Sequence, residues 1–378
     1  MPTLRDVVAV LDGLYDPAWA EDWDAVGTVV GDPSAEVRKI LFAVDPVQSV
    51  VDEAIAWGAD LLVTHHPLYL KGVTSVAATT PKGRVAHSLI ANGIALHTCH
   101  TNADSPPFGV SESMALALGL GDIRPLEPDP EAPVDKWVVF VPRDVADAVA
   151  AAMHLAGAGA IGTYDLVQFQ AEGTGSFRPL DGSTPAIGEV GSVEKVAEVR
   201  VEMVASRRLR EAVRTAMLDA HPYEEVAYDV LEPAAKASEQ GSGRVGTLSV
   251  PMSLHDFAEQ VTSCLPAHHG VTRVAGDPSR LIRTVALCGG SGDFLLATAN
   301  ASGADVYVTS DLRHHPVSEH LEQPGACAVV DVPHWAAEWT WLPVAAAALT
   351  ERSPDVEVRV STLVTDPWTS FVPGTVAL

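Results

Sequence analysis

The sequence predicts an α/β fold, with a core formed from the two ends of the chain and a smaller ferredoxin-like α+β domain inserted between them. Short, continuous apolar runs alternate with helical segments in the first third of the chain, and the same pattern returns in the last third. In the middle the order of strand and helix patterns changes, and segments rich in Pro, Gly and charge flank this region. We therefore expect the two halves of the core at residues 1–130 and 236–378, and the insert at 131–235.

In the first third, three apolar runs are predicted strands: Ile40–Val44, Leu61–Val63 and Ile94–Leu96. Helical patterns at Val50–Trp57 and Val85–Ala91 separate them. Apolar runs without polar alternation, joined through helices, are typical of parallel strands that are covered on both faces. Ligands of such sheets bind beyond the carboxyl ends of the strands, and the pair His65–His66 stands at such an end.

The last third repeats this pattern, with polar residues directly after each predicted strand. The strands are Thr284–Leu287, Asp305–Val308 and Ala328–Val330, and they are followed by Gly289–Gly292, Thr309–Asp311 and Asp331–His334. A helical stretch follows the glycines. Gly289–Gly292 is therefore either an ordinary turn or a cradle whose backbone N–H groups hold a phosphate.

The middle of the chain shows a β-α-β-β-α-β rhythm, which is typical of a ferredoxin-like module. Five of its six elements are predicted at Trp137–Val141, Asp144–Leu155, Ala197–Ala205, Leu209–Leu218 and Val226–Leu231. Two segments, Leu126–Pro133 and Glu232–Gly243, have the composition of linkers. After them, Arg244–Val250 and the helix Ser253–Cys264 return to the core.

Composition excludes several classes of function. The 378 residues include 24 Lys+Arg and 49 Asp+Glu, so the formal net charge is −25, and 47% of residues are hydrophobic. Such a chain can bury large cores and is not a disordered acidic tail. Its negative charge argues against binding to duplex nucleic acid and to anionic membranes, because both need a surplus of Lys and Arg.

The four cysteines lie far apart and form no CxxC pair, so neither a disulfide framework nor a zinc ribbon is predicted. Acidic residues interrupt the first twenty positions, and no run of about 18 apolar residues occurs. We therefore expect a soluble, cytoplasmic protein.

The number and arrangement of the histidines indicate a metal-binding site. Six of the 14 histidines form three adjacent pairs. Residue types that bind metals gather in three short segments that follow predicted strands: Thr64–Pro67, His100–Asp104 and His334–Glu338. Imidazole and carboxylate together suit Zn, Fe, Mn, Ni or Co, and carboxylates can bridge two ions.

Each segment alone has a simpler explanation. The pair His65–His66 is compatible with a surface loop, the i,i+4 pair His334–Glu338 with a solvated helix face, and His100–Asp104 with turn chemistry. Adjacent residues of a strand point to opposite faces, so a core cannot easily hide both histidines. Three such segments after buried strands therefore favour a shared site.

The chain resembles the Nif-three-like family, catalogued as GTP cyclohydrolase 1 type 2 homologues, in its long form with an insert. The segments that carry this resemblance in the core are Glu21–Gly27, Leu61–Val76, His100–Asp104, Gly289–Gly292, Ala304–His315 and Pro333–Glu338. Those in the insert are Val138–Pro142, Gly157–Asp165, Gly173–Pro179 and His221–Asp229. Together they span essentially the whole chain.

The resemblance implies a two-lobed α/β core that binds two divalent metal ions per chain. Carried onto this sequence, the ligands are His65, His66, Asp104, His334 and Glu338. It further implies a PII-like or CutA-like insert and assembly into toroidal hexamers.

Other residues leave alternatives open. Asp24 either lies near the metals or caps a helix. His315 is a candidate for contact with substrate or a structural polar residue, while His97 is better explained as packed than as a ligand. The segment His221–Glu225 is a turn or a second site in the insert. The pair His268–His269 is expected at the surface.

Two classes of function fit these observations. The first is a metal-dependent hydrolase with a small-molecule substrate, where two ions would supply hydroxide. Ring opening of GTP is suggested by the family name alone, and phosphoester hydrolysis is the rival chemistry. The second class is a non-catalytic regulator or assembly protein that binds metal or another ligand.

Overall fold

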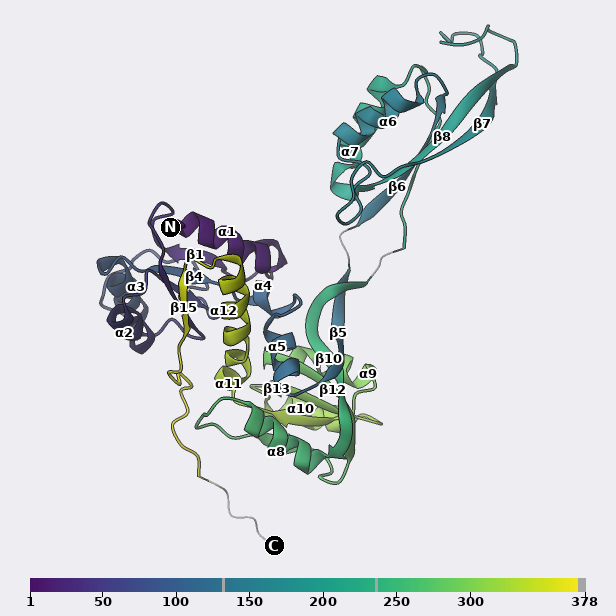
Figure 1. The fold of residues 1–378 in the computed structure, drawn as a ribbon. Coiled ribbons are helices and arrows are strands. Elements are labelled where there is room, and N and C mark those ends of the chain that lie inside the picture. The colour runs from purple at the N-terminus through teal and green to yellow at the C-terminus, as the bar shows by residue number, and fades with distance from the viewer. Residues whose placement is uncertain (131–132, 235–236, 373–378) are drawn as a thin grey trace. The chain divides into compact units, whose positions relative to one another are not determined.

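The computed structural model describes residues 1–130, 133–234 and 237–372. The chain divides into two compact units. The first combines Met1–Asp129 with Glu239–Leu378, and the second is Pro130–Ser238. Figure 1 shows the elements of both units. Strands and helices alternate along the chain and the strands form several sheets, which confirms the predicted mixed α/β class.

One sheet of the first unit comes mainly from the first third of the chain. Its strands, in spatial order, are β1 (Gly27–Val30), β4 (Ala95–Thr98), β3 (Leu61–Thr64), β2 (Lys39–Ala43) and β15 (Glu357–Val360). The last four are parallel and β1 is antiparallel to β4. Two helices, α2 (Gln48–Trp57) and α3 (Pro81–Ala91), connect the parallel strands.

This sheet is covered on both faces, as its apolar runs predict. Leu41 and Leu62 pack in one cluster with residues of α2 and α3. Ile40 and Phe42 belong to a second cluster on the other face, with residues of α1 (Leu4–Leu14) and α12 (Trp341–Arg352). Because side chains alternate between the faces of a strand, the buried apolar residues 40–43 of β2 need both layers.

The second sheet of this unit contains six strands. In spatial order they are β11 (Arg273–Ala275), β14 (Ala328–Asp331), β13 (Val306–Ser310), β12 (Leu281–Ser291), β10 (Ala237–Ser253) and β5 (Gly121–Pro130). Strands β12, β13 and β14 are parallel, while β11 is antiparallel to β14 and β10 is antiparallel to β12. Its helices are α8 (Leu254–Cys264), α9 (Leu296–Ala301) and α10 (His314–Leu321).

Three segments differ from the sequence prediction. Most of the predicted linkers Leu126–Pro133 and Glu232–Gly243 lie within strands β5 and β10, while residues 131–132 and 235–236 fall outside the described residues. The prolines of β5 are compatible with a strand because β5 is at the edge of its sheet, where missing N–H donors are tolerated. Strand β12 also runs through Gly289 and Gly290 to Ser291, so these glycines are not a separate loop.

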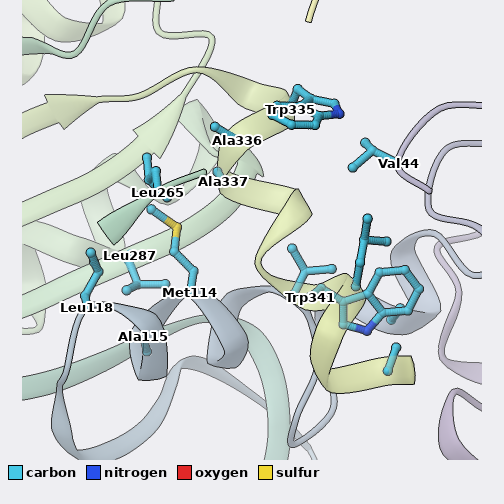
Figure 2. Close-up of a cluster of buried hydrophobic side chains, with 14 of the residues drawn as sticks. Val44, Met114, Ala115, Leu118, Leu265, Leu287, Trp335, Ala336, Ala337 and Trp341 are labelled. Atoms are coloured by element: carbon cyan, nitrogen blue, oxygen red, sulfur yellow. The ribbon is translucent and has the colours of Figure 1, made fainter. Parts of the chain in front are cut away.

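A shared core joins the two sheets of this unit. It contains Val63 of β3, Val308 of β13 and Trp341 of α12, together with residues of α5 (Val110–Ala117) and α11 (His334–Trp339). Figure 2 shows part of this core, with Met114 on α5 and with Trp335, Ala336, Ala337 and Trp341 along α11 and α12. The small alanines let α11 lie close to its neighbours, so the carboxyl ends of both sets of parallel strands face a common region.

The second unit has its own sheet and core. Its elements are β6 (Val134–Pro142), α6 (Ala146–Leu155), β7 (Phe169–Phe177), β8 (Glu194–Ser206), α7 (Arg210–Ala220) and β9 (Tyr228–Leu231). The element order is the predicted β-α-β-β-α-β, and the spatial order of the strands is β7-β8-β6-β9. Trp137, Met153, Val201 and Met217 are buried at its centre.

Within the described residues, no helix has both the length and the apolar character needed to cross a membrane.

His97 of β4 is packed in the core, in line with the simpler of its two interpretations. It is 1% exposed, and its Nδ1 lies 3.1 Å from Thr28 Oγ1. Burial disfavours the imidazolium and lowers the pKa of His97 to about 4, from an ordinary value of 6.5.

We predict that His97→Gln reduces the pH dependence of stability in acid. The pKa of His97 is lower in the folded than in the unfolded state, so its contribution is complete above about pH 6.5 and is lost as the pH falls towards 4. Between pH 7 and pH 5 the parent should lose about 2 kcal/mol more unfolding free energy than the variant. Urea unfolding at both pH values measures this, and equal losses would contradict it.

Candidate metal centre

Side chains from the ends of five parallel strands meet in the first unit. Asp45 follows β2, His65 and His66 follow β3, and His100 with the short helix α4 (Thr101–Asp104) follows β4. From the second sheet, Asp311 follows β13, and α11 with His334 and Glu338 follows β14. Parallel strands carry their carboxyl ends at one edge, so two such edges bring these groups together.

The five residues implied by the resemblance lie in contact around Glu338. From Glu338 Oε1, the distance to Nε2 of His334 is 2.7 Å and to Nε2 of His65 is 3.4 Å, and Glu338 Oε2 lies 3.0 Å from Nε2 of His66. Asp104 Oδ1 is 3.7 Å from Nε2 of His65. One cluster therefore unites all three predicted segments.

Several of these close atoms are not hydrogen-bonded to one another. Asp104 Oδ1, His334 Nε2 and Glu338 Oε2 are buried, and none has a hydrogen-bond partner among the described residues. Their short separations thus lack hydrogen-bond geometry and instead suit atoms that aim at a common centre. A divalent ion with bonds of about 2.0–2.2 Å keeps its ligand atoms about 3–3.5 Å apart. The residues therefore fit a bound metal ion.

Four imidazoles are held by their Nδ1 atoms. Nδ1 of His65 is 3.0 Å from the carbonyl oxygen of Cys99. The other anchors are carboxylates, at Asp45 for His66 (2.7 Å), Asp24 for His100 (2.8 Å) and Asp311 for His334 (2.7 Å). Each anchor is an acceptor, so Nδ1 carries the proton and the lone pair of Nε2 is left for a metal.

His100 is a sixth candidate ligand that the implied set does not contain. Ligand atoms of His65, His66 and His100 lie within 4.8 Å of one another, and so do those of His66, His334 and Glu338. The sequence signal for His100 was its place directly after a buried strand. The two groups share His66.

Asp24 supports this cluster and is not a ligand candidate. Its buried carboxylate accepts hydrogen bonds from the backbone N–H of Thr101 and from His100. Burial opposes its ionisation, yet these hydrogen bonds hold the pKa of Asp24 below its usual value. Of the two interpretations for Asp24, the structure therefore favours a position beside the site.

Sequence reasoning did not assign Asp45 and Asp311 to the site. Both directly follow predicted strands, which is the signal that could have found them. Their function as partners of His66 and His334 depends on tertiary contacts between separate strands.

In the protein without bound metal, the imidazoles of His66 and His334 keep their protons at neutral pH. Burial opposes protonation, but Glu338 and Asp45 raise the pKa of His66 to about 10, and Glu338 and Asp311 raise the pKa of His334 to about 11. Burial would raise the pKa of Glu338, but the neighbouring imidazoles hold it well below its usual value. Because a metal needs deprotonated ligands, binding would release these protons.

Position 290 of the glycine-rich segment requires glycine because the backbone passes close to Glu338. A Cβ at this position would lie 2.5 Å from Glu338 Oε1, and the backbone has φ +75°. Gly290 therefore lets β12 pass directly beside the carboxylate. Gly289–Ser291 also line a cavity of about 380 Å³.

The centre borders two cavities. The smaller includes His100, Asp104 and Glu338 in its wall, with the exposed aromatic side chains Trp23 and Phe294. The larger, of about 610 Å³, lies beside the C-terminal segment. His66 and His334 line both cavities.

The remaining candidates lie elsewhere. His315 is exposed at the start of α10, beside the ring of His314, and does not line either cavity. His269 is exposed and borders the larger cavity. In the second unit, Nε2 of His221 donates to the carbonyl oxygen of Phe140, and its Nδ1 accepts from the backbone of Tyr223. Both nitrogens of His221 are thus engaged in the fold.

The chain after Asp104 is held by a buried cation. Arg244 of β10 is 0% exposed, and its guanidinium donates to Glu112 and to four carbonyl oxygens. These carbonyls belong to Ser105, Pro106, Gly241 and Gly243. Arg244 thus connects β10 to the residues that follow α4.

The chain is similar in sequence and in structure to known proteins over nearly its whole length. The family described as Duf34/NIF3 (NGG1p interacting factor 3) matches residues 2–367. A "GTP cyclohydrolase 1 type 2 homolog" from Mycobacterium tuberculosis is 48% identical over 367 residues, which cover 97% of this chain and 96% of that protein. A Bacillus cereus protein related to NIF3 has a TM-score of 0.74 and 35% identity, covering 98% of this chain and 99% of that one. Staphylococcus aureus protein SA1388 has a TM-score of 0.83 and 28% identity over the same shares.

We predict that Arg244→Met strongly destabilises the first unit. The variant leaves Glu112 without its ion pair and removes the guanidinium donors of four carbonyl oxygens, although those of Ser105 and Pro106 each keep one backbone donor. The free energy of unfolding should therefore fall by about 3–5 kcal/mol. Arg38→Met is the matched control, because Arg38 forms an exposed pair with Glu36 and should cost less than about 1 kcal/mol. Chemical denaturation of both variants measures the difference. Equal losses would contradict the role of Arg244.

Proposed function

This chain belongs to the Duf34/NIF3 family, and on that premise we propose that it is a dinuclear metal-binding protein that acts as a metal-dependent hydrolase on a nucleotide or another phosphoester. The observation that carries the proposal is the convergence of imidazole Nε2 atoms on the buried carboxylate of Glu338.

The proposed ligands are His65, His66, Asp104, His334 and Glu338. Two overlapping groups of potential ligand atoms, rather than one, support two ions. Asp104 and Glu338 provide four carboxylate oxygens, and a carboxylate can bridge two ions. His100 provides a further nitrogen at the edge of the same cluster.

When bound, two such ions would lower the pKa of a coordinated water and so supply hydroxide near neutral pH. The residues of this chain would hold the ligand geometry. Asp45 and Asp311 orient the rings of His66 and His334. Asp24 orients His100, and the aromatic side chains of Trp23 and Phe294 line the smaller cavity.

A small-molecule substrate fits the space beside the cluster. Cavities of about 380 and 610 Å³ are within the range of small-molecule sites. The relatives' name suggests that the substrate is GTP and the reaction is ring opening. Hydrolysis of a phosphoester is the other candidate, because a two-metal site also stabilises in-line attack at phosphorus.

One observation favours a non-catalytic regulator as the second candidate. Apart from Glu21 and the buried Cys288, the titratable side chains that line the smaller cavity are proposed ligands or His100. The smaller cavity therefore offers few side chains that could act as a general acid without also being a candidate metal ligand.

We also propose that the protein is cytoplasmic and forms a homo-oligomer, with a hexamer as the form suggested by the resemblance. The second unit would then be a PII-like or CutA-like insert with a sensing or assembly function. Its separate core supports an independent module.

The enzyme and the regulator are separated by a turnover assay on GTP and a panel of phosphodiesters. We predict metal-dependent turnover that Asp104→Ala reduces by at least about a hundredfold, since this variant removes a proposed ligand. Asp355→Ala, at an exposed position, is the control. Full metal loading without turnover of any substrate would favour the regulator.

A second prediction concerns metal affinity. Asp45→Asn should weaken metal binding about 10–100-fold, because the carboxylate that orients His66 is lost. Asp52→Asn changes an exposed carboxylate of α2 and should leave affinity unchanged. Competition with a chromogenic chelator measures both. An unchanged affinity in Asp45→Asn would show that this carboxylate does not position a ligand.

A further inference from the structure

The larger cavity contains one carboxylate with a buried oxygen that accepts no hydrogen bond from any described residue. Four aspartates line this cavity, and three of them are engaged. Asp45 bonds His66, Asp311 bonds His334, and Asp331 accepts from Nε of Arg273 (2.8 Å) and from the backbone of Leu312 (2.9 Å). The fourth is Asp366.

Asp366 is only 8% exposed, yet one of its oxygens has no partner. Oδ1 accepts from the backbone N–H of Trp368 at 3.0 Å. Oδ2 is buried and makes no hydrogen bond to any described residue. An unpaired buried carboxylate oxygen is costly, which indicates that a ligand donor satisfies it.

The surroundings of Asp366 suit a flat ring. Trp335, Trp368 and Phe371 line the same cavity, with Pro333 and Pro367. Trp368 and Phe371 are largely exposed, so their ring faces are free for stacking.

Gly270 keeps this space open. A Cβ at position 270 would lie 2.6 Å from Pro333 Cγ and 3.3 Å from Asp366 Oδ2. Any larger residue would therefore crowd the free oxygen.

The segment that carries Asp366 is tied to the candidate metal centre. The hydroxyl of Thr365 donates to Asp45, which is the partner of His66. Upstream, Nε1 of Trp339 donates to the carbonyl oxygen of Ser361 at 2.9 Å. Since His66 and His334 line the same cavity, a ligand held by Asp366 would extend towards the centre.

From this geometry we infer that the larger cavity binds the base of a guanine-type nucleoside, with Asp366 as the residue that selects it. The inference rests on the proposed function, because it places the substrate's base beside the proposed metal ligands. A carboxylate only accepts hydrogen bonds. Guanine offers two adjacent donors, the ring N1–H and the 2-amino group, whereas adenine places an acceptor at N1.

The test measures binding of guanosine, inosine and adenosine to the full-length protein by calorimetry. Nucleosides lack phosphates, so metal–phosphate contacts do not mask recognition of the base. The parent should bind guanosine most tightly, inosine more weakly because it lacks the 2-amino group, and adenosine weakest.

Asp366→Asn is the decisive variant, because Oδ2 offers only acceptor lone pairs and the substitution replaces it with an N–H donor. We expect guanosine affinity to fall about tenfold or more, with adenosine unchanged or tighter, so that the preference inverts. A merely structural role would weaken all nucleosides equally. Asp355→Asn, at an exposed position, should leave all affinities unchanged.

A thermal melt of Asp366→Asn checks its folding. If this variant does not fold, Trp368→Leu replaces it, since the side chain of Trp368 is exposed and its loss should weaken guanosine binding severalfold. Equal affinity of the parent for all three nucleosides, or an unchanged guanosine preference in Asp366→Asn, would overturn the inference.

The metal content of the same samples separates the two proposals. Metal-loaded protein that binds no nucleoside would overturn only the selection by Asp366. Protein whose ligand cluster takes up no metal would instead overturn the proposed function.

Discussion

A buried carboxylate sets the main constraint on this protein. Glu338 is 3% exposed and lies on a helix packed between two sheets. Removing an ionised carboxylate from water costs several kcal/mol unless positive charge compensates it. In the protein alone, the imidazoles of His66 and His334 supply that charge by keeping their protons. Metal ions in their place would compensate Glu338 and leave the imidazoles neutral.

The rest of the first unit holds this cluster in place. Parallel strands from both sheets end at it, the small side chains of Ala336 and Ala337 let α11 pack closely (Figure 2), and Gly290 lets β12 pass beside the carboxylate. Anchors at Nδ1 fix the orientation of each imidazole. Ligands that are held in advance lose little freedom when a metal binds, which favours affinity and selectivity.

Much of this arrangement could be predicted from the sequence. Apolar runs such as Ile40–Val44 revealed the parallel strands, and their ends revealed His65 and His66. The second half of β5 and the first part of β10 have the composition of linkers because Pro and Gly are frequent there, while their pairing depends on distant partners. For the same reason, the partners of Asp45, Asp311 and Arg244 were not predictable, since each contact joins segments that are far apart in the sequence or on separate strands.

The central claim is that two metal ions share this cluster, and anomalous diffraction from metal-replete crystals tests it most directly. The account predicts two anomalous peaks per chain, both within bonding distance of the Nε2 atoms or carboxylate oxygens of His65, His66, Asp104, His334 and Glu338. Elemental analysis of the same protein should give about two ions per chain. A single peak at these atoms, or metal bound only elsewhere, would contradict the claim.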